Sequence, residues 1–138
     1  MFIPAHSLAS GEVNLRMAKY APAGWPRVIP RISADDPKAV VSFIRHVFGA
    51  IGDHHPGRPS ELRLGDSIIL VGAATEREAM SAFLYVYVED ADTVYRLALE
   101  QGARSLEEPR DTPYGDRRAM VRDLWGNIWQ IATRRAEV

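Results

Sequence analysis

The chain has 138 residues, of which 46% are hydrophobic and 25% charged, and its formal net charge is −1. This composition is ordinary for one globular domain, and the near-neutral charge argues against nucleic acid or an anionic membrane as a partner. Without cysteine the chain has no disulfides, thiolate metal sites or cysteine nucleophiles. The sequence shows no membrane-spanning apolar run and no signal-peptide pattern, so we expect a cytoplasmic protein.

Residues 1–24 differ from the rest of the chain. They show no sustained hydrophobic period, and they lead into a loop-like segment at 21–26 that is rich in alanine and proline. We expect them to form an N-terminal extension that is poorly ordered or lies on the surface. Residues 25–138 are then expected to form a single domain.

The first half of this domain, about residues 27–72, predicts a strand, a helix and two further strands. The helix begins at Asp36-Pro37, because Asp caps free amides and Pro suits the first helical position, and Gly49 ends it. The predicted strands are 27–33, 60–64 and 67–72.

The second half, about residues 82–134, repeats this order. Asp90 caps its helix and Gly102 ends it. Its predicted strands are 83–88, 105–107, 117–121 and 127–133. The repetition predicts an α+β fold of two βαβββ units that form mixed sheets, with helices on the outer face and a ligand cavity on the inner face.

Strand alternation assigns side chains to these two faces. At 83–88, the aliphatic residues Leu84, Val86 and Val88 are expected to pack on the helices, leaving Phe83, Tyr85 and Tyr87 on the inner face. The aromatic face either lines a ligand cavity or fills a second core.

The same alternation applies to the remaining strands. Expected to face the helices are Val28, Pro30, Ile32, Ala119, Val121, Trp129 and Ile131. Expected on the inner face are Ile29, Arg31, Ser33, Arg118, Met120, Ile128, Gln130 and Ala132. An inward arginine is costly to bury without a partner, which is either an acidic side chain of the protein or an anionic ligand.

Several segments resemble a known family. They are Glu-Leu-Arg-Leu-Gly-Asp-Ser at 61–67, Tyr-Val-Tyr-Val-Glu-Asp at 85–90, Tyr-Gly-Asp-Arg at 114–117 and Arg-Asp-Leu-Trp-Gly at 122–126. Together with the paired units, they resemble the vicinal oxygen chelate superfamily over residues 27–134, and within it the PhnB-like subgroup. That superfamily includes glyoxalase I, bleomycin and fosfomycin resistance proteins and extradiol dioxygenases.

The resemblance also implies where metal ligands would lie in the metal-dependent members. They occupy inward positions of the first and last strand of each unit, which by spacing fall here on Ile29, Ile69, Phe83 and Gln130. Three of these side chains are hydrocarbon and cannot hold a divalent ion. We therefore predict no metal and no cofactor.

Two further clusters allow simpler explanations. His54 and His55 are adjacent, so on an extended chain they point apart, and a solvated loop pair is expected rather than a chelate. Asp116 and Arg117, beside Tyr114, either shape the rim of a pocket or form a structural ion pair.

These observations favour a metal-independent small-molecule-binding protein of the superfamily, one that sequesters a drug or metabolite. The alternative is an enzyme of the same superfamily (lyase, isomerase or dioxygenase-like) that uses Tyr85, Tyr87 or Arg118 as acid or electrostatic stabiliser. A metal-dependent lyase or dioxygenase with displaced ligands is a third possibility. The expected partners are a small-molecule ligand and a second copy of the chain. The candidate ligand-binding residues are Arg31, Phe83, Tyr85, Tyr87, Tyr114, Arg118, Met120 and Gln130.

Overall fold

The computed structural model describes residues 20–75 and 78–135, so most of the predicted N-terminal extension lies outside the described residues. Its elements form a three-stranded sheet in the order β1-β3-β2 and a four-stranded sheet in the order β4-β7-β6-β5. In chain order they are β1 (Arg31–Ala34), α2 (Pro37–Phe48), β2 (Ser60–Leu64), β3 (Ser67–Ala73), β4 (Phe83–Tyr87), α3 (Ala91–Glu100), β5 (Arg104–Asp111), β6 (Asp116–Arg122) and β7 (Ile128–Arg134).

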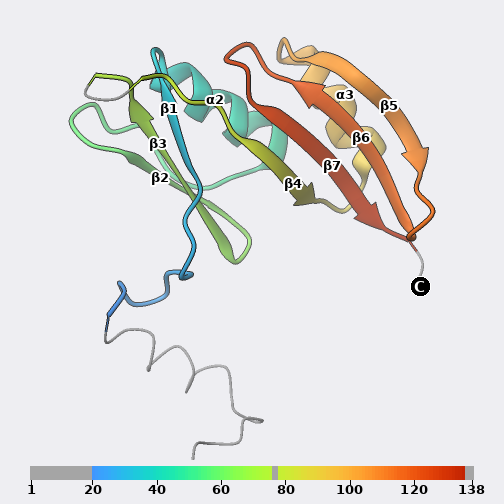
Figure 1. Cartoon of the computed structure of the whole chain (residues 1–138), viewed down its shortest axis with the longest axis horizontal. Helices are drawn as coiled ribbons and strands as arrows, with labels where there is room; N and C mark the ends of the chain where they lie inside the picture. The colour runs from blue at the N-terminus through green and yellow to red at the C-terminus, as the bar shows by residue number, and fades with distance from the viewer. Residues whose placement is uncertain (1–19, 76–77, 136–138) are drawn as a thin grey trace, which may run out of the picture.

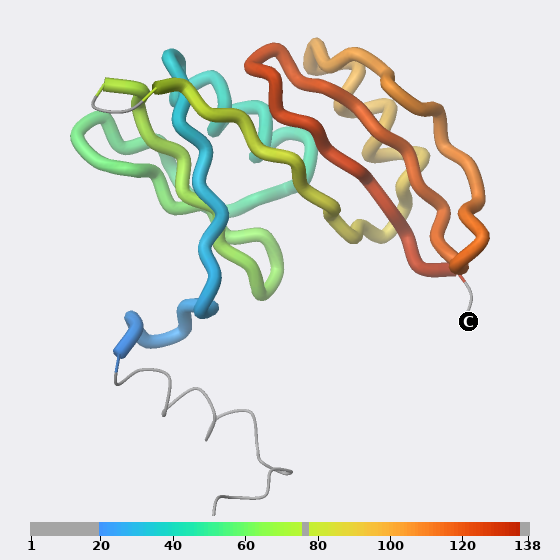
Figure 2. Tube along the Cα trace, viewed as in Figure 1, coloured from blue at the N-terminus to red at the C-terminus, as the bar shows by residue number. Residues whose placement is uncertain are grey.

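The two helices cover one face of the sheets and leave the other face open (Figure 1). The sheets meet edge to edge, where Ser33 of β1 and Met80, just before β4, exchange two backbone hydrogen bonds of 3.1 and 2.8 Å. The trace in Figure 2 shows β1 and the segment leading into β4 side by side at this junction. The predicted α+β fold, with helices outside and open inner faces, is confirmed. Neither helix of the described chain is long and apolar enough to cross a membrane.

Helix α2 has the ends that the sequence predicts. The Asp36 carboxylate accepts a hydrogen bond from the amide of Ala39 at 3.1 Å, and Pro37 occupies the first turn, where its missing N–H costs nothing. Gly49 ends the helix at φ 72°, a left-handed conformation that favours glycine. The inward face of α2 carries the buried residues Val40, Val41, Phe43, Ile44 and Val47.

One hydrophobic core joins the two units. Phe48 of α2 packs against Trp129 of β7 with ring centroids 4.8 Å apart, and Phe43 packs edge-on against Trp125 at 5.8 Å. Trp129 is fully buried. Because these aromatic pairs cross from the first unit to the second, the helix of one unit and the last hairpin of the other share the burial of their apolar surface.

The first strand is shorter than predicted. We expected 27–33, but β1 spans Arg31–Ala34, and Val28, expected to face the helices, is 81% exposed. Pro26 and Pro30 have no N–H to donate, so the ladder starts only where Pro30 accepts a hydrogen bond from Leu70.

The two units are not equal in strand content. The second contains the complete strand, helix and three strands, and β5 extends well past the predicted 105–107 with two register shifts. As an edge strand it tolerates both these shifts and Pro109. In the first unit the strand after the helix is reduced to a single bridge between Ile51 and Arg63. Residues 52–59 therefore form a loop beside the first sheet and not a strand.

Candidate ligand-binding site

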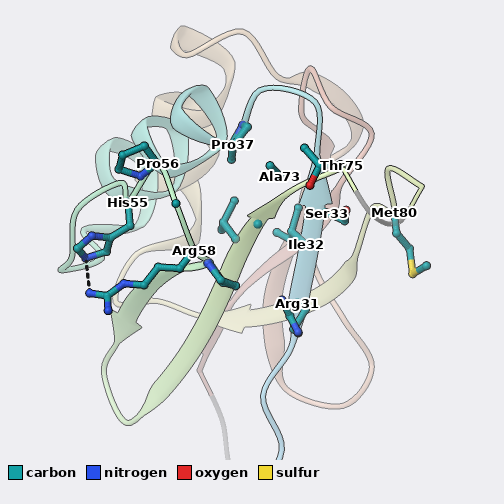
Figure 3. Close-up of a pocket in the computed structure, with 14 residues that line it drawn as sticks. Arg31, Ile32, Ser33, Pro37, His55, Pro56, Arg58, Ala73, Thr75 and Met80 are labelled. Carbon is teal, nitrogen blue, oxygen red and sulfur yellow. Dashed lines mark hydrogen bonds between the residues drawn. The ribbon is translucent and has the colours of Figure 1, made fainter.

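A cavity of about 610 Å³ lies on the inner face of the first sheet (Figure 3). Strands β1 and β3 form its floor, and the loop of residues 55–59 and the segment around Met80 form its walls. None of the described residues that line it is acidic. The described lining consists of Arg31, Ile32, Ser33, Pro37, His55, Pro56, Gly57, Arg58, Pro59, Val71, Gly72, Ala73, Thr75 and Met80.

Arg31 is placed in this cavity by the alternation of β1. Ile32 and Ala34 are buried toward the helices, so Arg31 and Ser33 point to the opposite face. A guanidinium nitrogen of Arg31 lies 3.8 Å from where a Cβ on Gly72 would stand, which places it over β3. No carboxylate of the described residues forms an ion pair with it. The cavity therefore holds a positive charge without a protein counter-ion among these residues.

The loop at 55–59 forms the wall opposite Met80. The His55 amide donates a hydrogen bond of 2.8 Å to the buried Ser60 hydroxyl, which fixes the base of the loop. The Arg58 side chain reaches toward the His55 ring, and their nitrogens are 3.4 Å apart (Figure 3). A smaller cavity of about 320 Å³ shares His55, Arg58 and Pro59 with the larger one, and Trp25, Glu61 and Leu70 complete its described lining.

Most of the candidate residues lie instead on the inner face of the second sheet. Phe83, Tyr85 and Tyr87 share that face with Gln130 and Met120, as strand alternation predicted. Phe83 is 66% exposed and Tyr87 60% exposed, so these rings do not fill a closed core in the single chain. Neither of the two cavities includes a residue of this sheet. Of the eight candidates, Arg31 is the one that lines the larger cavity.

The tyrosines of this second face share one carboxylate. The hydroxyls of Tyr85 and Tyr87 donate to the same Asp116 oxygen at 2.6 and 2.9 Å, and Arg134 binds the other oxygen at 3.2 Å. The Tyr85 hydrogen bond, with those of Tyr87 and Arg134, holds the pKa of Asp116 below its usual range despite burial. Burial and the Asp116 hydrogen bond raise the pKa of Tyr85, and the Asp116 hydrogen bond raises that of Tyr87. Both hydroxyl protons are therefore committed to Asp116.

Arg118 has an acidic partner within the protein. Its side chain is 12% exposed and donates to Glu107 at 2.6 Å and to the Tyr114 hydroxyl at 2.8 Å. An inward arginine was expected to pair with either an acidic side chain of the protein or an anionic ligand. Arg118 pairs with an acidic side chain, that of Glu107. Its Nε atom is buried without a hydrogen-bond partner among the described residues.

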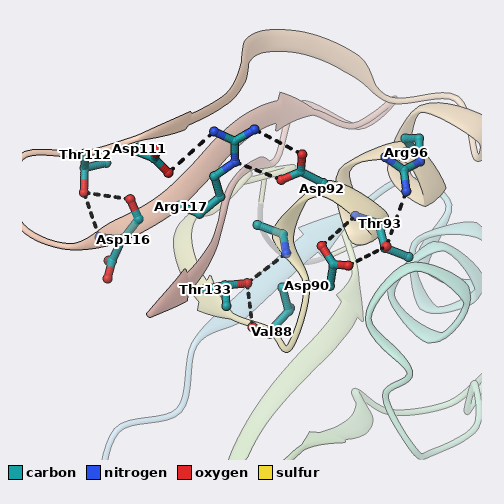
Figure 4. Close-up of polar contacts among 11 residues, drawn as sticks. Val88, Asp90, Asp92, Thr93, Arg96, Asp111, Thr112, Asp116, Arg117 and Thr133 are labelled. Atoms are coloured by element: carbon teal, nitrogen blue, oxygen red, sulfur yellow. Dashed lines mark hydrogen bonds and ion pairs between the residues drawn. The ribbon is translucent and has the colours of Figure 1, made fainter. Parts of the chain in front are cut away.

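Asp116 and Arg117 do not pair with each other. Asp116 points to the tyrosine face, whereas Arg117 points outward and holds Asp92 of α3 through two hydrogen bonds of 3.0 and 3.2 Å (Figure 4). Nearby, the Thr133 hydroxyl accepts from the Ala91 amide and donates to the Val88 carbonyl. This outer group fastens the start of α3 to the second sheet and leaves the inner face unaffected.

One of the four positions implied as metal ligands needs correction. Ser33 and Tyr87 are equivalent residues of the two units, because each lies three residues before the N-cap of its helix. Ser33 pairs with Gly72 and Tyr87 pairs with Ala132, so Gly72 and Ala132 are also equivalent. The inward residue equivalent to Gln130 is therefore Leu70 and not Ile69, which is buried in the core. Ile69 and Gln130 each lie four residues after a turn glycine, Gly65 or Gly126. That spacing misplaced the position in the first unit, because its hairpin turn is Gly65-Asp66 alone and the second hairpin turn is longer.

The corrected set does not fit a metal. Ile29, Leu70 and Phe83 have no donor atoms, and Gln130 offers only an amide. Within the described parts of the chain, no three His, Asp or Glu side chains are grouped as a metal site would require.

Sequence reasoning missed most of the residues that shape the cavity, and among them are His55, Arg58 and Gly72. The histidine was expected to be a solvated loop residue, and it does lie in an exposed loop, but the loop folds over the first sheet. The shortening of the first unit, visible as a polar stretch where the second unit has a strand, is the signal that could have identified this wall.

Comparisons with known proteins agree with this architecture. The family model described as the Glyoxalase/Bleomycin resistance protein/Dioxygenase superfamily matches residues 28–131. Among curated proteins, no sequence matches the chain.

Solved structures match over most of the chain. TioX from Micromonospora sp. ML1 superposes with a TM-score of 0.68 at 23% identity, covering 79% of this chain and 98% of that one. A glyoxalase/bleomycin resistance protein/dioxygenase family enzyme from Burkholderia phytofirmans PsJN gives 0.66 at 22% identity, with 77% and 96% covered. A lactoylglutathione lyase from Agrobacterium tumefaciens gives 0.62 at 20% identity, with 78% and 94% covered. At these identities the similarity shows the fold alone.

Proposed function

The chain belongs to the Glyoxalase/Bleomycin resistance protein/Dioxygenase superfamily, and within it we propose a metal-independent protein that binds a small anionic molecule and sequesters it. The observation that carries this proposal is the cavity over the first sheet, in which Arg31 has no counter-ion among the described residues and no described lining residue is acidic. A cavity of about 610 Å³ is in the range that encloses small organic ligands. We also propose the PhnB-like subgroup for this chain, on the same segments that resemble the superfamily, at 61–67, 85–90, 114–117 and 122–126.

The chemistry of the lining supports an anion with an apolar body. A guanidinium group has planar donors that match a carboxylate or phosphate, and hydrogen bonds to charged groups are the strong ones. Met80 and the ring carbons of Pro37, Pro56 and Pro59 offer apolar surface around that charge. The body of such a ligand would lie against these side chains, with its anionic group at Arg31.

The donor set supports independence from metal. Isoleucine, leucine and phenylalanine occupy three of the four positions where the metal-dependent members carry ligands, and these side chains have no donor atom for a metal. The enzymatic alternative through Tyr85 or Tyr87 gains no support from the second sheet, because Asp116 binds both hydroxyl protons and the pKa of each tyrosine is raised.

The test is calorimetry on protein dialysed against EDTA, with 2-naphthoate and its neutral isostere 2-naphthamide. We expect 2-naphthoate to bind with unchanged affinity before and after dialysis, and 2-naphthamide to bind at least about tenfold more weakly, the loss of one charged hydrogen bond. Equal binding of the two compounds would contradict an anion site. Binding that appears only with an added divalent metal would contradict independence from metal.

We also propose that the protein is a homodimer. The inner face of the second sheet presents Phe83 and Tyr87 to solvent, on a side that neither helix covers (Figure 1). Exposed aromatic side chains gathered on one face are typical of surfaces that bind other proteins. A second copy of the chain, covering this face, would bury them.

A further inference from the structure

We propose that Gly72 determines the shape of the ligand: it keeps the cavity floor flat, so that the site accepts a planar aromatic anion and rejects a globular anion of similar size. This inference rests on the proposed function, because it assigns the ligand class of the same cavity. Gly72 has no side chain to offer a charge or a donor, and its contribution is that absence.

The backbone does not require glycine at this position. Gly72 lies in β3 opposite Ser33 and does not have the positive φ found at seven other glycines. The ladder of β1 with β3 runs in register from Arg31 to Ala34, so no bulge explains a glycine here.

Packing does not require glycine either. A Cβ at residue 72 would meet an Arg31 nitrogen and the Pro59 ring at 3.8 Å, which is ordinary contact. An alanine would therefore fit between the neighbours that the structure places there. Glycine inside a strand is nevertheless unfavourable, and it often marks a point where another molecule approaches the backbone closely.

The repeat shows that this position of the fold accepts a side chain. Ser33 and Tyr87 are equivalent, since each lies three residues before its helix cap, and their β partners are Gly72 and Ala132. Ala132 is fully buried in the second sheet, where no described cavity lies. The unit with the cavity thus carries glycine where the other unit carries alanine.

The bare peptide at Gly72 suits a flat ring. A methyl group there would stand about 1.5 Å above the backbone, and a ring that lay on the peptide would lose its contact distance of about 3.5–4 Å. A guanidinium nitrogen of Arg31 lies 3.8 Å from the position of that methyl group, and the planar guanidinium can pair with a carboxylate attached to the ring. Pro59 and Met80 bound the same surface from the loop and from the junction of the sheets.

The experiment is calorimetry with 2-naphthoate and 1-adamantanecarboxylate, which share the carboxylate and differ in the shape of the body. We expect the wild type to prefer 2-naphthoate by at least about tenfold. Gly72→Ala should remove most of this preference by weakening 2-naphthoate, with a melting temperature equal to or above the wild-type value, because the residue has no positive φ. Ala132→Gly is the matched control: it should lower the melting temperature and leave the preference unchanged.

Two results would overturn the inference alone: equal affinity of the wild type for both carboxylates, or an undiminished preference in Gly72→Ala. If neither carboxylate binds the wild type, the proposed function fails and this inference fails with it. The wild type could prefer 2-naphthoate over 2-naphthamide and yet bind 1-adamantanecarboxylate as tightly as 2-naphthoate. That result would support the anion site and contradict the role of Gly72 in selecting a planar ligand.

Discussion

The carboxylate of Asp123 accepts a hydrogen bond of 2.9 Å from the indole Nε1 of Trp129, and both residues are buried. The same carboxylate accepts from the Trp125 amide and from the amide and side chain of Asn127. Asn127 in turn accepts a hydrogen bond from the Ala82 amide at 2.8 Å, which fixes the start of β4. One acidic side chain in the last turn therefore orients the core tryptophan and, through Asn127, the first strand of the same unit.

We expect Asp123→Ala to lower the free energy of unfolding by about 3 kcal/mol, because it leaves the buried Trp129 indole and the Asn127 side chain without their acceptor. Urea denaturation followed by circular dichroism measures the change. Asp53→Ala is the control, since the Asp53 side chain is 84% exposed in its ion pair with Arg45, and exposed pairs contribute little. A loss for Asp123→Ala no larger than that of the control would show that the network is not stabilising.

Acid should destabilise the protein through Asp116 and Asp92. The Tyr85 hydrogen bond on Asp116 and the Arg117 hydrogen bonds on Asp92 lower the pKa of each carboxyl in the folded state. At pH values between the folded pKa values and the ordinary value near 3.9, the unfolded chain therefore binds more protons than the folded chain. The stabilisation is fully present above that ordinary value and is lost as the pH falls through the folded pKa values.

Urea denaturation between pH 7 and 2 tests this expectation. Asp116→Asn should flatten the acid limb of the profile, because residue 116 then no longer titrates. Asp53→Asn serves as the surface control. An acid limb equally steep in Asp116→Asn and in the wild type would show that other groups cause the acid loss.

The fold was predictable wherever a local pattern determines the structure. Helix α2 begins and ends at Asp36 and Gly49 because capping is local, and Phe83, Tyr85 and Tyr87 share a face because strand alternation is local. The start of β1 was not predictable from alternation. It depends on which amides find a partner on β3, and the prolines before Arg31 limit that choice.

The candidate site was predictable only in part. Strand alternation identified Arg31 as inward, but the wall at 55–59 depends on long-range geometry, namely the single bridge of Ile51 to Arg63 and the His55 hydrogen bond to Ser60. The error at Ile69 has a similar origin, since the offset between the two units depends on the lengths of their hairpin turns. Pairing is also non-local: the sequence placed Arg118 inward but did not show that Glu107 neutralises it.

If the inner face of the second sheet is a dimer surface, Phe83→Asp should make the protein monomeric in sedimentation equilibrium, because a charge replaces an exposed aromatic side chain at the contact. Since Phe83 is largely exposed in the single chain, the variant should keep its fold and its circular dichroism spectrum. Leu124→Asp, at an exposed apolar residue of the last turn, should remain dimeric. A wild-type protein that sediments as a monomer at micromolar concentration would contradict the dimer.

Arg31 and Arg118 should respond differently to loss of charge. Arg31→Gln removes a cavity cation that has no counter-ion among the described residues, and we expect it to weaken 2-naphthoate by roughly 1.5–3 kcal/mol, the usual contribution of a hydrogen bond to a charged group. Its melting temperature should stay close to that of the wild type. Arg118→Gln should lower the melting temperature, because Glu107 loses its partner at 2.6 Å, and should leave the affinity nearly unchanged.

The control for the charge itself is Arg27→Gln, which removes a positive charge four residues from Arg31 at a side chain that lies over the Tyr20 ring and outside the cavity. If general electrostatic attraction draws in the anion, Arg27→Gln and Arg31→Gln should weaken 2-naphthoate equally, and this loss should shrink at high salt. A direct contact instead predicts a loss specific to Arg31 that persists at high salt. Unchanged affinity in Arg31→Gln together with a loss in Arg118→Gln would move the anion site to the inner face of the second sheet.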